Sequence, residues 1–400
     1  METQINIAII IVAYNRPEAL ERILFSISKA DFTGFTKIPL IISIDKSEDG
    51  KVILIAKSFE WKFGEKKIII QNERLGLRKH IISCGDLAEK YDNIIILEDD
   101  LFVAPFFYSY AQSALNFFRD HERIAGISLY SYDCNELAHL PFDPIDDGYD
   151  NYFMQVPCSW GQLWTWKQWY EFKKFYESED SELKFTDNIS DIIINKWPDS
   201  SWKKYFYKYM VEKDKYFVYP RSSYTTNFGD TGTHFTEITG IYQVNLNLGR
   251  REMNFCKFEL SLSKYDSYFE ILPETIKKSN PEMRSYDFEC DLYGIKELNK
   301  ISKKYLLSAR DCADPICSFS AAMMPSEMNI IFGIKGDYFS LGERANFSTL
   351  NIRKMAGGRF YHKINIETLK AIVAMKSISY RLFSALLIPF KVIKNLFRIH

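Results

Sequence analysis

The chain has 400 residues, which is long for one domain and indicates two domains or one large domain with appendages. Its formal net charge is −1 at pH 7, so no overall basic field favours nucleic acid as a partner. Seven scattered cysteines without a CxxC pair argue against a disulfide framework or a zinc site and favour a reducing, cytoplasmic compartment. No uncharged apolar run approaches the length of a membrane span, and residues 7–12 are interpreted as a first strand and not as a signal peptide.

The first hundred residues alternate between strand and helix patterns. Aliphatic runs at residues 7–13, 39–44, 67–70 and 94–97 predict strands, and the last of them is typical of a strand buried on both faces in a parallel sheet. Apolar residues at helical spacing predict a helix over 18–28, and a further helix is expected to run from the third strand to about residue 90. This order predicts an α/β fold with a doubly wound sheet.

Three carboxylates, Glu98, Asp99 and Asp100, follow the strand at 94–97 directly. Ligands of open α/β sheets sit just beyond the carboxyl ends of strands, so charged chemistry is expected here. Adjacent carboxylates repel one another, and a hard cation such as Mg²⁺ or Mn²⁺ relieves that repulsion. In a strand-like trace Glu98 and Asp100 share one side and Asp99 takes the other, which would separate metal binding from ligand binding. A solvated acidic turn is the alternative.

Six short motifs, in order, carry a resemblance to a known family. They are residues 12–17, 43–45, 74–78, 97–100 with 104–105, 159–161 with 165–166, and 227–229 with 233–234. Together they resemble nucleotide-sugar glycosyltransferases of the GT-A fold, and within it N-acetylglucosaminyltransferase I and bacterial surface-polysaccharide transferases. The resemblance implies a Rossmann-like, mostly parallel sheet flanked by helices. It also implies metal-dependent, inverting transfer of a sugar from a nucleotide-sugar donor, expected to be UDP-linked, to a saccharide acceptor.

The resemblance also assigns residues to the donor nucleotide. Arg16 is expected to bind the diphosphate or the base, because a guanidinium matches such groups in a planar, bidentate manner. Asp45 resembles the residue that accepts a hydrogen bond from uracil, although it could equally be a helix cap or a turn former. Arg78 and His80 fall where the family places a basic residue near the phosphates, and a lone histidine is more often structural.

Within the acidic triplet, the resemblance makes Asp100 the ligand of Mn²⁺ or Mg²⁺. Asp99 would bind ribose or sugar hydroxyls and Glu98 would steady the loop. One protein carboxylate suffices, because the diphosphate and waters can complete an octahedral shell.

Two further motifs concern the sugar and the phosphate. Trp160 and Gly161 are expected at the acceptor or donor-sugar site, since indole faces stack on sugar rings and glycine lets a ligand approach the backbone. Trp166 and Trp169 are interpreted as structural. Thr233 and His234, in a glycine-rich loop, are expected on the phosphate, with an ordinary polar turn as the alternative.

The identity of the catalytic base is where the sequence departs from its relatives. They carry an acid directly after the tryptophan that corresponds to Trp202, and this chain has Lys203 there, in a lysine pair interpreted as solvated. Inverting transfer needs a carboxylate to take the proton of the acceptor hydroxyl. Asp199 is the nearest replacement, unless it only starts or caps the following helix, and Asp230 is a second candidate.

The domain prediction has three parts: a GT-A catalytic domain over 1–245, an accessory α+β region over 246–365, and a basic amphipathic helical tail over 366–400. Within the accessory region, residues 329–332 are strand-like. In the catalytic domain, residues 143–150 are expected to form a solvated acidic loop. The segment 369–398 is predicted either to lie in a membrane surface, where a lipid-linked acceptor waits, or to pack on the domain or in a homodimer.

Two other functions stay open at this point. A sugar nucleotidyltransferase would also combine an early nucleotide loop with metal-binding acids, but it usually has a glycine-rich loop after the first strand, and residues 14–17 lack glycine. A non-catalytic protein that binds nucleotide-sugars or glycans is the other alternative, because Lys203 stands in place of the expected acid.

Overall fold

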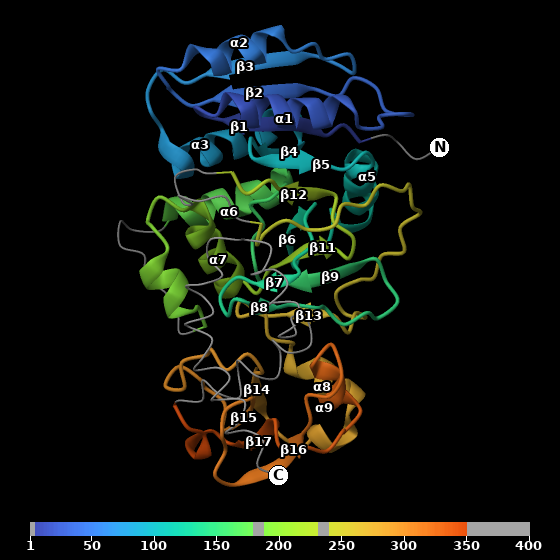
Figure 1. The fold of residues 1–400 in the computed structure, drawn as a ribbon, viewed down its shortest axis with the longest axis vertical. Coiled ribbons are helices and arrows are strands. Elements are labelled where there is room, and N and C mark those ends of the chain that lie inside the picture. Colours follow the sequence, from blue (N-terminus) through green and yellow to red (C-terminus); the bar gives the residue numbers. More distant parts are fainter. Residues whose placement is uncertain (1–4, 179–187, 231–239, 350–400) are drawn as a thin grey trace, which may run out of the picture.

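The computed structural model describes residues 5–178, 188–230 and 240–349 (Figure 1). Within these ranges the centre of the fold is a nine-stranded sheet in the order β13-β9-β11-β6-β10-β4-β1-β2-β3. Most of its strand pairs are parallel. The exceptions are β10, which runs antiparallel to both β4 and β6, and β11, which runs antiparallel to β9. The strands are β1 Ala8–Ala13, β2 Leu40–Ile44, β3 Lys66–Ile70, β4 Asn93–Glu98, β6 Ile124–Ser128, β9 Asn151–Met154, β10 Gln162–Thr165, β11 Tyr216–Pro220 and β13 Lys264–Tyr265.

Helices cover both faces of this sheet, which confirms the predicted α/β class. Alternation along β4 sends Ile95 and Leu97 to one face and Ile94 and Ile96 to the other, and all four are buried. The helices are α1 Pro17–Ser28, α2 Gly50–Ser58, α3 Gly76–Gly85, α4 Ala88–Tyr91, α5 Phe107–Phe118, α6 Trp166–Ser178 and α7 Trp202–Glu212, with a π-helical turn at Ile192–Lys196.

The helix expected to continue to about residue 90 is interrupted between α3 and α4. The break follows Gly85, where the indole of Trp169 packs against the backbone. An added Cβ there would lie 2.1 Å from the ring, so only glycine fits beneath this tryptophan. Trp169 is fully buried and donates to Asp86, in agreement with its predicted structural role.

A smaller sheet lies at the end of the molecule opposite β3 (Figure 1). In the described part of the chain it has four strands in the order β14-β15-β17-β16, and α8 and α9 accompany it. The prediction of a strand at 329–332 is wrong, because this run lies in and just beyond helix α9; short apolar runs do not distinguish the two structures by periodicity. The elements are α8 Pro273–Ser279, β14 Phe288–Asp291, β15 Tyr305–Ser308, β16 Pro315–Phe319, α9 Glu327–Ile331 and β17 Phe339–Glu343.

The chain beyond residue 245 also contributes to the large sheet, because β13 pairs with β9. Two short antiparallel pairs complete the architecture: β5 Leu101–Val103 with β12 Thr225–Asn227, and β7 Cys134–Asn135 with β8 Leu140–Pro141. None of the helices in the described ranges has the length and apolar character needed to cross a bilayer. The predicted tail at 366–400 lies outside the described residues.

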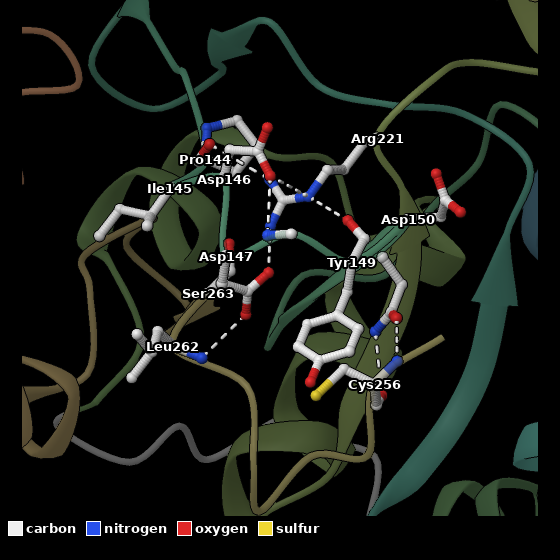
Figure 2. Close-up of polar contacts among 12 residues, drawn as sticks. Pro144, Ile145, Asp146, Asp147, Tyr149, Asp150, Arg221, Cys256, Leu262 and Ser263 are labelled. Carbon is white, nitrogen blue, oxygen red and sulfur yellow. Dashed lines mark hydrogen bonds and ion pairs between the residues drawn. The ribbon is translucent and has the colours of Figure 1, made fainter. Parts of the chain in front are cut away.

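The acidic segment 143–150 is solvated only in part. The Asp147 side chain is 3% exposed and accepts from Arg221, at 2.7 Å, as well as from the Ser261 hydroxyl and the Leu262 amide. Figure 2 shows the same guanidinium binding the carbonyls of Pro144 and Tyr149. The prediction of a solvated loop is therefore wrong for Asp147. Its carboxylate connects this loop to the end of β11 and to the segment before β13.

Candidate functional site

Four neighbouring parallel strands, β4, β1, β2 and β3, end at one edge of the sheet, and each leads into charged residues. Asp99 and Asp100 follow β4, and Arg16 lies in the loop after β1. Arg16 Nη1 donates to Asp100 Oδ2 at 3.2 Å, and Nη2 contacts Asp99 Oδ1. The expected alternation of the acids is wrong here, because the strand ends at Glu98 and a turn brings Asp99 and Asp100 to the same guanidinium.

The charged groups of this cluster shift one another's pKa values. Burial raises the pKa of Asp99 to about 7, with Arg16 opposing and Asp100 reinforcing the shift. Burial and the neighbouring Asp100 raise the pKa of Glu98 to about 8. Burial alone disfavours the charge of Arg16, but Asp99 and Asp100 outweigh it and raise the pKa of the guanidinium. One arginine thus faces three acids, and a further cation would be bound favourably.

Asp45, at the end of β2, is buried beneath the start of α3. Its carboxylate accepts from the Leu75 and Gly76 amides at 2.8 and 2.9 Å and lies 3.4 Å from Arg74 Nε. The capping role that the sequence left open is therefore present, and the contact with uracil stays a prediction. The guanidinium carbon of Arg74 lies 3.2 Å above the ring of Tyr14, so the loops after β1 and β3 are in contact.

Arg78 and His80, both on α3, have different surroundings. Arg78 donates to the carbonyl oxygen of Asp199 at 2.7 Å and to the Tyr205 hydroxyl, and it has no ion pair within the described residues. His80 is buried, with Nε2 2.8 Å from Ser43 Oγ, and burial lowers its pKa to about 4. The imidazole is therefore neutral at pH 7, which favours the structural alternative for His80 and leaves Arg78 as the cation available to a phosphate.

Trp160 lies in an aromatic cluster, with its ring 4.6 Å from that of Tyr242 and 4.8 Å from that of Tyr130. Gly161 has φ of +96°, and an added Cβ would lie 2.9 Å from Thr225 Cγ2. The glycine is thus required by its conformation and by a neighbouring side chain of the protein. The partly buried Trp166 packs on Tyr170, with ring centroids 5.3 Å apart, as expected of a structural residue.

The two candidate bases both bind cations. The Asp199 side chain is 83% exposed and accepts from Lys204 Nζ at 2.9 Å, and no side-chain hydrogen bond caps α7. Asp230 pairs with Arg22 of α1. The interpretation of Lys203 and Lys204 as solvated is wrong: both are buried, because their ammonium groups find carboxylate partners in Glu136 and Asp199.

Arg22 and Glu136 are the charged residues of this region that sequence reasoning missed. Arg22 pairs with Asp230 and lies 3.8 Å above the ring of Phe228. Glu136 is 67 residues from its partner Lys203 and lies in a segment without a motif, so no spacing in the sequence links the two. The predicted phosphate ligands Thr233 and His234 lie outside the described residues.

The donor chemistry of the triplet can be compared with the cation that the resemblance implies. Across the described ranges no three His, Cys, Asp or Glu side chains converge as a ready-made metal site. Asp100 is partly exposed and adjoins two acids whose pKa values burial raises. These residues fit a hard cation held jointly by one protein carboxylate and the oxygens of a bound diphosphate.

Comparison with solved structures finds distant similarities. The S. aureus TarS fragment 1–349 in complex with UDP is 12% identical, with a TM-score of 0.37, over 55% of this chain and 59% of that one. GalNAc-T7 with UDP, GalNAc and Mn²⁺ is 11% identical, with a TM-score of 0.37, over 55% and 43%. The mannosyltransferase PcManGT of Pyrobaculum calidifontis, with GDP-Man and Mn²⁺, is 12% identical, with a TM-score of 0.30, over 42% and 46%.

Comparison of sequences finds a nearer match, although no protein-family model matches the chain. Over 314 residues the chain is 21% identical to the alpha-1,3-mannosyl-glycoprotein 2-beta-N-acetylglucosaminyltransferase of Arabidopsis thaliana. The match covers 74% of this chain and 63% of the relative, so the chain spans less than two thirds of that protein's length. It confirms the resemblance to an N-acetylglucosaminyltransferase that the ordered motifs predict.

Proposed function

We propose that the protein is a glycosyltransferase that moves a sugar from a UDP-sugar to a saccharide acceptor, with inversion at the anomeric carbon. The observation that carries the proposal is the set of charged residues at the carboxyl edge of the parallel strands: Arg16 after β1, Asp45 after β2, Arg78 after β3 and the acidic triplet after β4. Sheets of this kind bind nucleotides at that edge. The similarity to an N-acetylglucosaminyltransferase supports the same class of donor.

Each residue has a role in this proposal. Asp45 accepts from the base, Asp99 binds ribose or sugar hydroxyls, and Arg16 and Arg78 bind the diphosphate as it leaves. Asp100 would hold Mn²⁺ or Mg²⁺ together with the diphosphate, and the bound cation would supply positive charge next to the leaving group. Asp199 takes the proton of the acceptor hydroxyl while that oxygen bonds to the anomeric carbon and the bond to the diphosphate breaks. Trp160 supplies an aromatic face for a sugar ring.

The Arg78–Asp199 contact supports the pairing of these roles. Arg78 comes from the strand edge that would bind the nucleotide, and it holds the backbone of the residue proposed as base. A base must lie within hydrogen-bond reach of the acceptor hydroxyl, directly or through one water. The hydrogen bond between Arg78 and the backbone of Asp199 would hold the group that binds the diphosphate and the proposed base at a fixed separation.

The test is a transfer assay with a panel of UDP- and GDP-sugars, oligosaccharide acceptors and Mn²⁺. We expect release of UDP and a product whose new linkage, by NMR, has the anomeric configuration opposite to that of the donor. Binding without turnover would favour the non-catalytic alternative. Pyrophosphate release from UTP and a sugar 1-phosphate would favour a nucleotidyltransferase instead.

For the acceptor and location, we propose a surface glycan assembled in the cytoplasm, at the inner face of the membrane. The basic residues within 369–398 support membrane contact, since each lysine or arginine near an anionic surface contributes about 1 kcal/mol. Flotation with anionic liposomes should separate full-length protein from a truncation before residue 366. Equal flotation of the two would indicate a packing or homodimer helix.

A further inference from the structure

Lys203 and Glu136 form an ion pair inside the protein, next to the proposed sugar site. Lys203 Nζ lies 3.1 and 3.4 Å from the two carboxylate oxygens of Glu136, and the two side chains are 9% and 7% exposed. Glu136 Oε1 also accepts from the hydroxyls of Tyr132 at 3.3 Å and Tyr207 at 3.4 Å. This oxygen therefore has three donors, and the Glu136 side chain has little access to solvent.

The ammonium of Lys203 also contacts two tryptophans. It lies 5.2 Å from the centre of the Trp160 ring and 5.0 Å from that of Trp197, distances at which a cation is attracted to an aromatic face. Trp160 is the proposed sugar platform, and Trp197 begins the segment that leads to Asp199. The pair is therefore next to both the proposed sugar platform and the segment that carries the proposed base.

The next lysine, Lys204, forms hydrogen bonds with the same segment, residues 197–199. Lys204 Nζ donates to the Trp197 carbonyl at 3.3 Å and to Asp199 Oδ1 at 2.9 Å. Two consecutive lysines at the start of α7 thus bind the ring of Trp197, its carbonyl group and the carboxylate of Asp199. The two lysines therefore hold the segment 197–199 against the start of helix α7.

We propose that the Lys203–Glu136 pair is a positioning element for sugar transfer. It fixes the ring of Trp160 and the segment 197–199, so that the acceptor and the base meet in a single geometry. This inference rests on the proposed function and adds a role for the lysine that replaces the acid of the relatives. A buried ion pair gives little net stability compared with apolar side chains of similar size, so orientation is the property that such a pair can supply.

The experiment separates positioning from stability with a charge-neutral double variant. Lys203→Met and Glu136→Gln each leave one buried charge without its partner, and we expect a clear loss of thermal stability in each. In Lys203→Met/Glu136→Gln no unpaired charge is left, so the melting temperature should return close to that of the wild type. The double variant should still bind UDP with unchanged affinity while kcat/KM for the acceptor stays at least 10-fold lower. Lys203→Arg, which keeps the charge, should recover part of this loss.

The control is a second ion pair on the same helix, between a buried lysine and a more exposed glutamate. Lys208 Nζ lies 3.1 Å from Glu212 Oε1 and 5.1 Å from the Phe175 ring, so Lys208→Met/Glu212→Gln removes a lysine–glutamate pair of α7 that has no contact with Trp160 or Trp197 among the described residues. We expect this control to keep the kcat/KM of the wild type. If the Lys203→Met/Glu136→Gln variant also keeps it, the pair is only structural and the proposal is overturned.

A second readout does not depend on transfer. Hydrogen exchange is followed in peptides that cover residues 158–162 and 195–202, and we expect faster exchange in the double variant at unchanged global stability. Unchanged exchange in both peptides overturns the positioning role even if no acceptor is found. Absence of transfer by the wild type with all donors would instead refute the proposed function.

Discussion

His80 Nε2 lies 2.8 Å from the hydroxyl oxygen of Ser43, inside the protein and directly below the strand edge that carries Asp45. This contact joins α3 to β2. It therefore also holds the loops after β2 and β3, which the Asp45–Arg74 ion pair connects. Burial keeps the imidazole neutral, because the charged form would have to give up its hydration.

The first prediction is a pH dependence of stability that comes from this histidine. Its pKa is about 4 in the folded protein against an ordinary value of 6.5, so between these values the unfolded chain binds more protons than the folded one. The contribution of neutral His80 to the free energy of unfolding is fully present above pH 6.5 and is lost as the pH falls towards 4. The loss is about 1.4 kcal/mol for each unit of difference between the two pKa values. Urea unfolding at a series of pH values measures it.

His80→Gln, which can keep a hydrogen bond to Ser43, should show a flatter profile over this window. His121→Gln is the control, because His121 lies at the partly exposed position beyond α5. Parallel profiles for the wild type and His80→Gln would mean that His80 has the same pKa in the folded and the unfolded chain.

The second prediction concerns the cation. Asp100→Ala should weaken UDP binding in the presence of Mn²⁺ to the level measured with EDTA, because no other acid of the turn is as well placed to share a cation with the diphosphate. The loss should exceed the 10- to 100-fold that removal of groups around metal ligands typically costs, about 2 orders of magnitude or more. Calorimetric titration of UDP with and without Mn²⁺ measures it.

Asp120→Ala, at an exposed aspartate beyond α5, is the control and should bind as the wild type does. Equal Mn²⁺-dependent affinity in Asp100→Ala and the wild type would remove Asp100 from the metal site.

Local sequence patterns predicted those elements that are determined by interactions between residues close together in the sequence. The isoleucines of β4, Pro17 at the start of α1 and the acids at the end of β4 each act through neighbours a few residues away. The surroundings of Lys203 and Asp147 could not be predicted in this way, since their partners Glu136 and Arg221 are 67 and 74 residues distant. Whether a charged residue is solvated depends on tertiary contacts, and a single sequence contains no signal for them.

The third prediction uses two glycines with similar backbone conformation. Gly161→Ala combines a left-handed conformation with a Cβ 2.9 Å from Thr225 Cγ2, whereas Gly148 has φ of +85° and no atom within 4 Å of an added Cβ. Gly148→Ala should therefore cost only the conformational penalty of about 1–2 kcal/mol. Gly161→Ala should cost a further 1–3 kcal/mol or so from overpacking.

Chemical denaturation of both variants measures the difference. The added methyl group at 161 should also move Trp160 and impair transfer, while Gly148→Ala should be fully active. Equal destabilisation of the two variants would mean that Thr225 moves aside without cost.

The last prediction concerns the base. Asp199→Asn should lower kcat by about 10²–10⁴, the usual range for loss of a general base, and leave the Kd for the donor unchanged. The matched control is Asp287→Asn, since Asp287 is also an exposed carboxylate that pairs with a lysine, Lys303, far along the chain from the site. Stopped assays with a saturating donor, and calorimetry for donor affinity, give the two quantities.

Lys204 provides an independent check on Asp199. Its hydrogen bond holds the pKa of Asp199 below the ordinary value, so Lys204→Met should move the acid limb of the kcat/KM profile to higher pH. A change of Lys204 that only disturbed helix α7 would lower the rate at every pH and leave the limb in place. Normal turnover of Asp199→Asn would clear Asp199 and point to Asp230, which could take the proton only after release from Arg22. Loss of donor binding or of folding in Asp199→Asn would mean that Asp199 serves Arg78 and α7 as a structural residue.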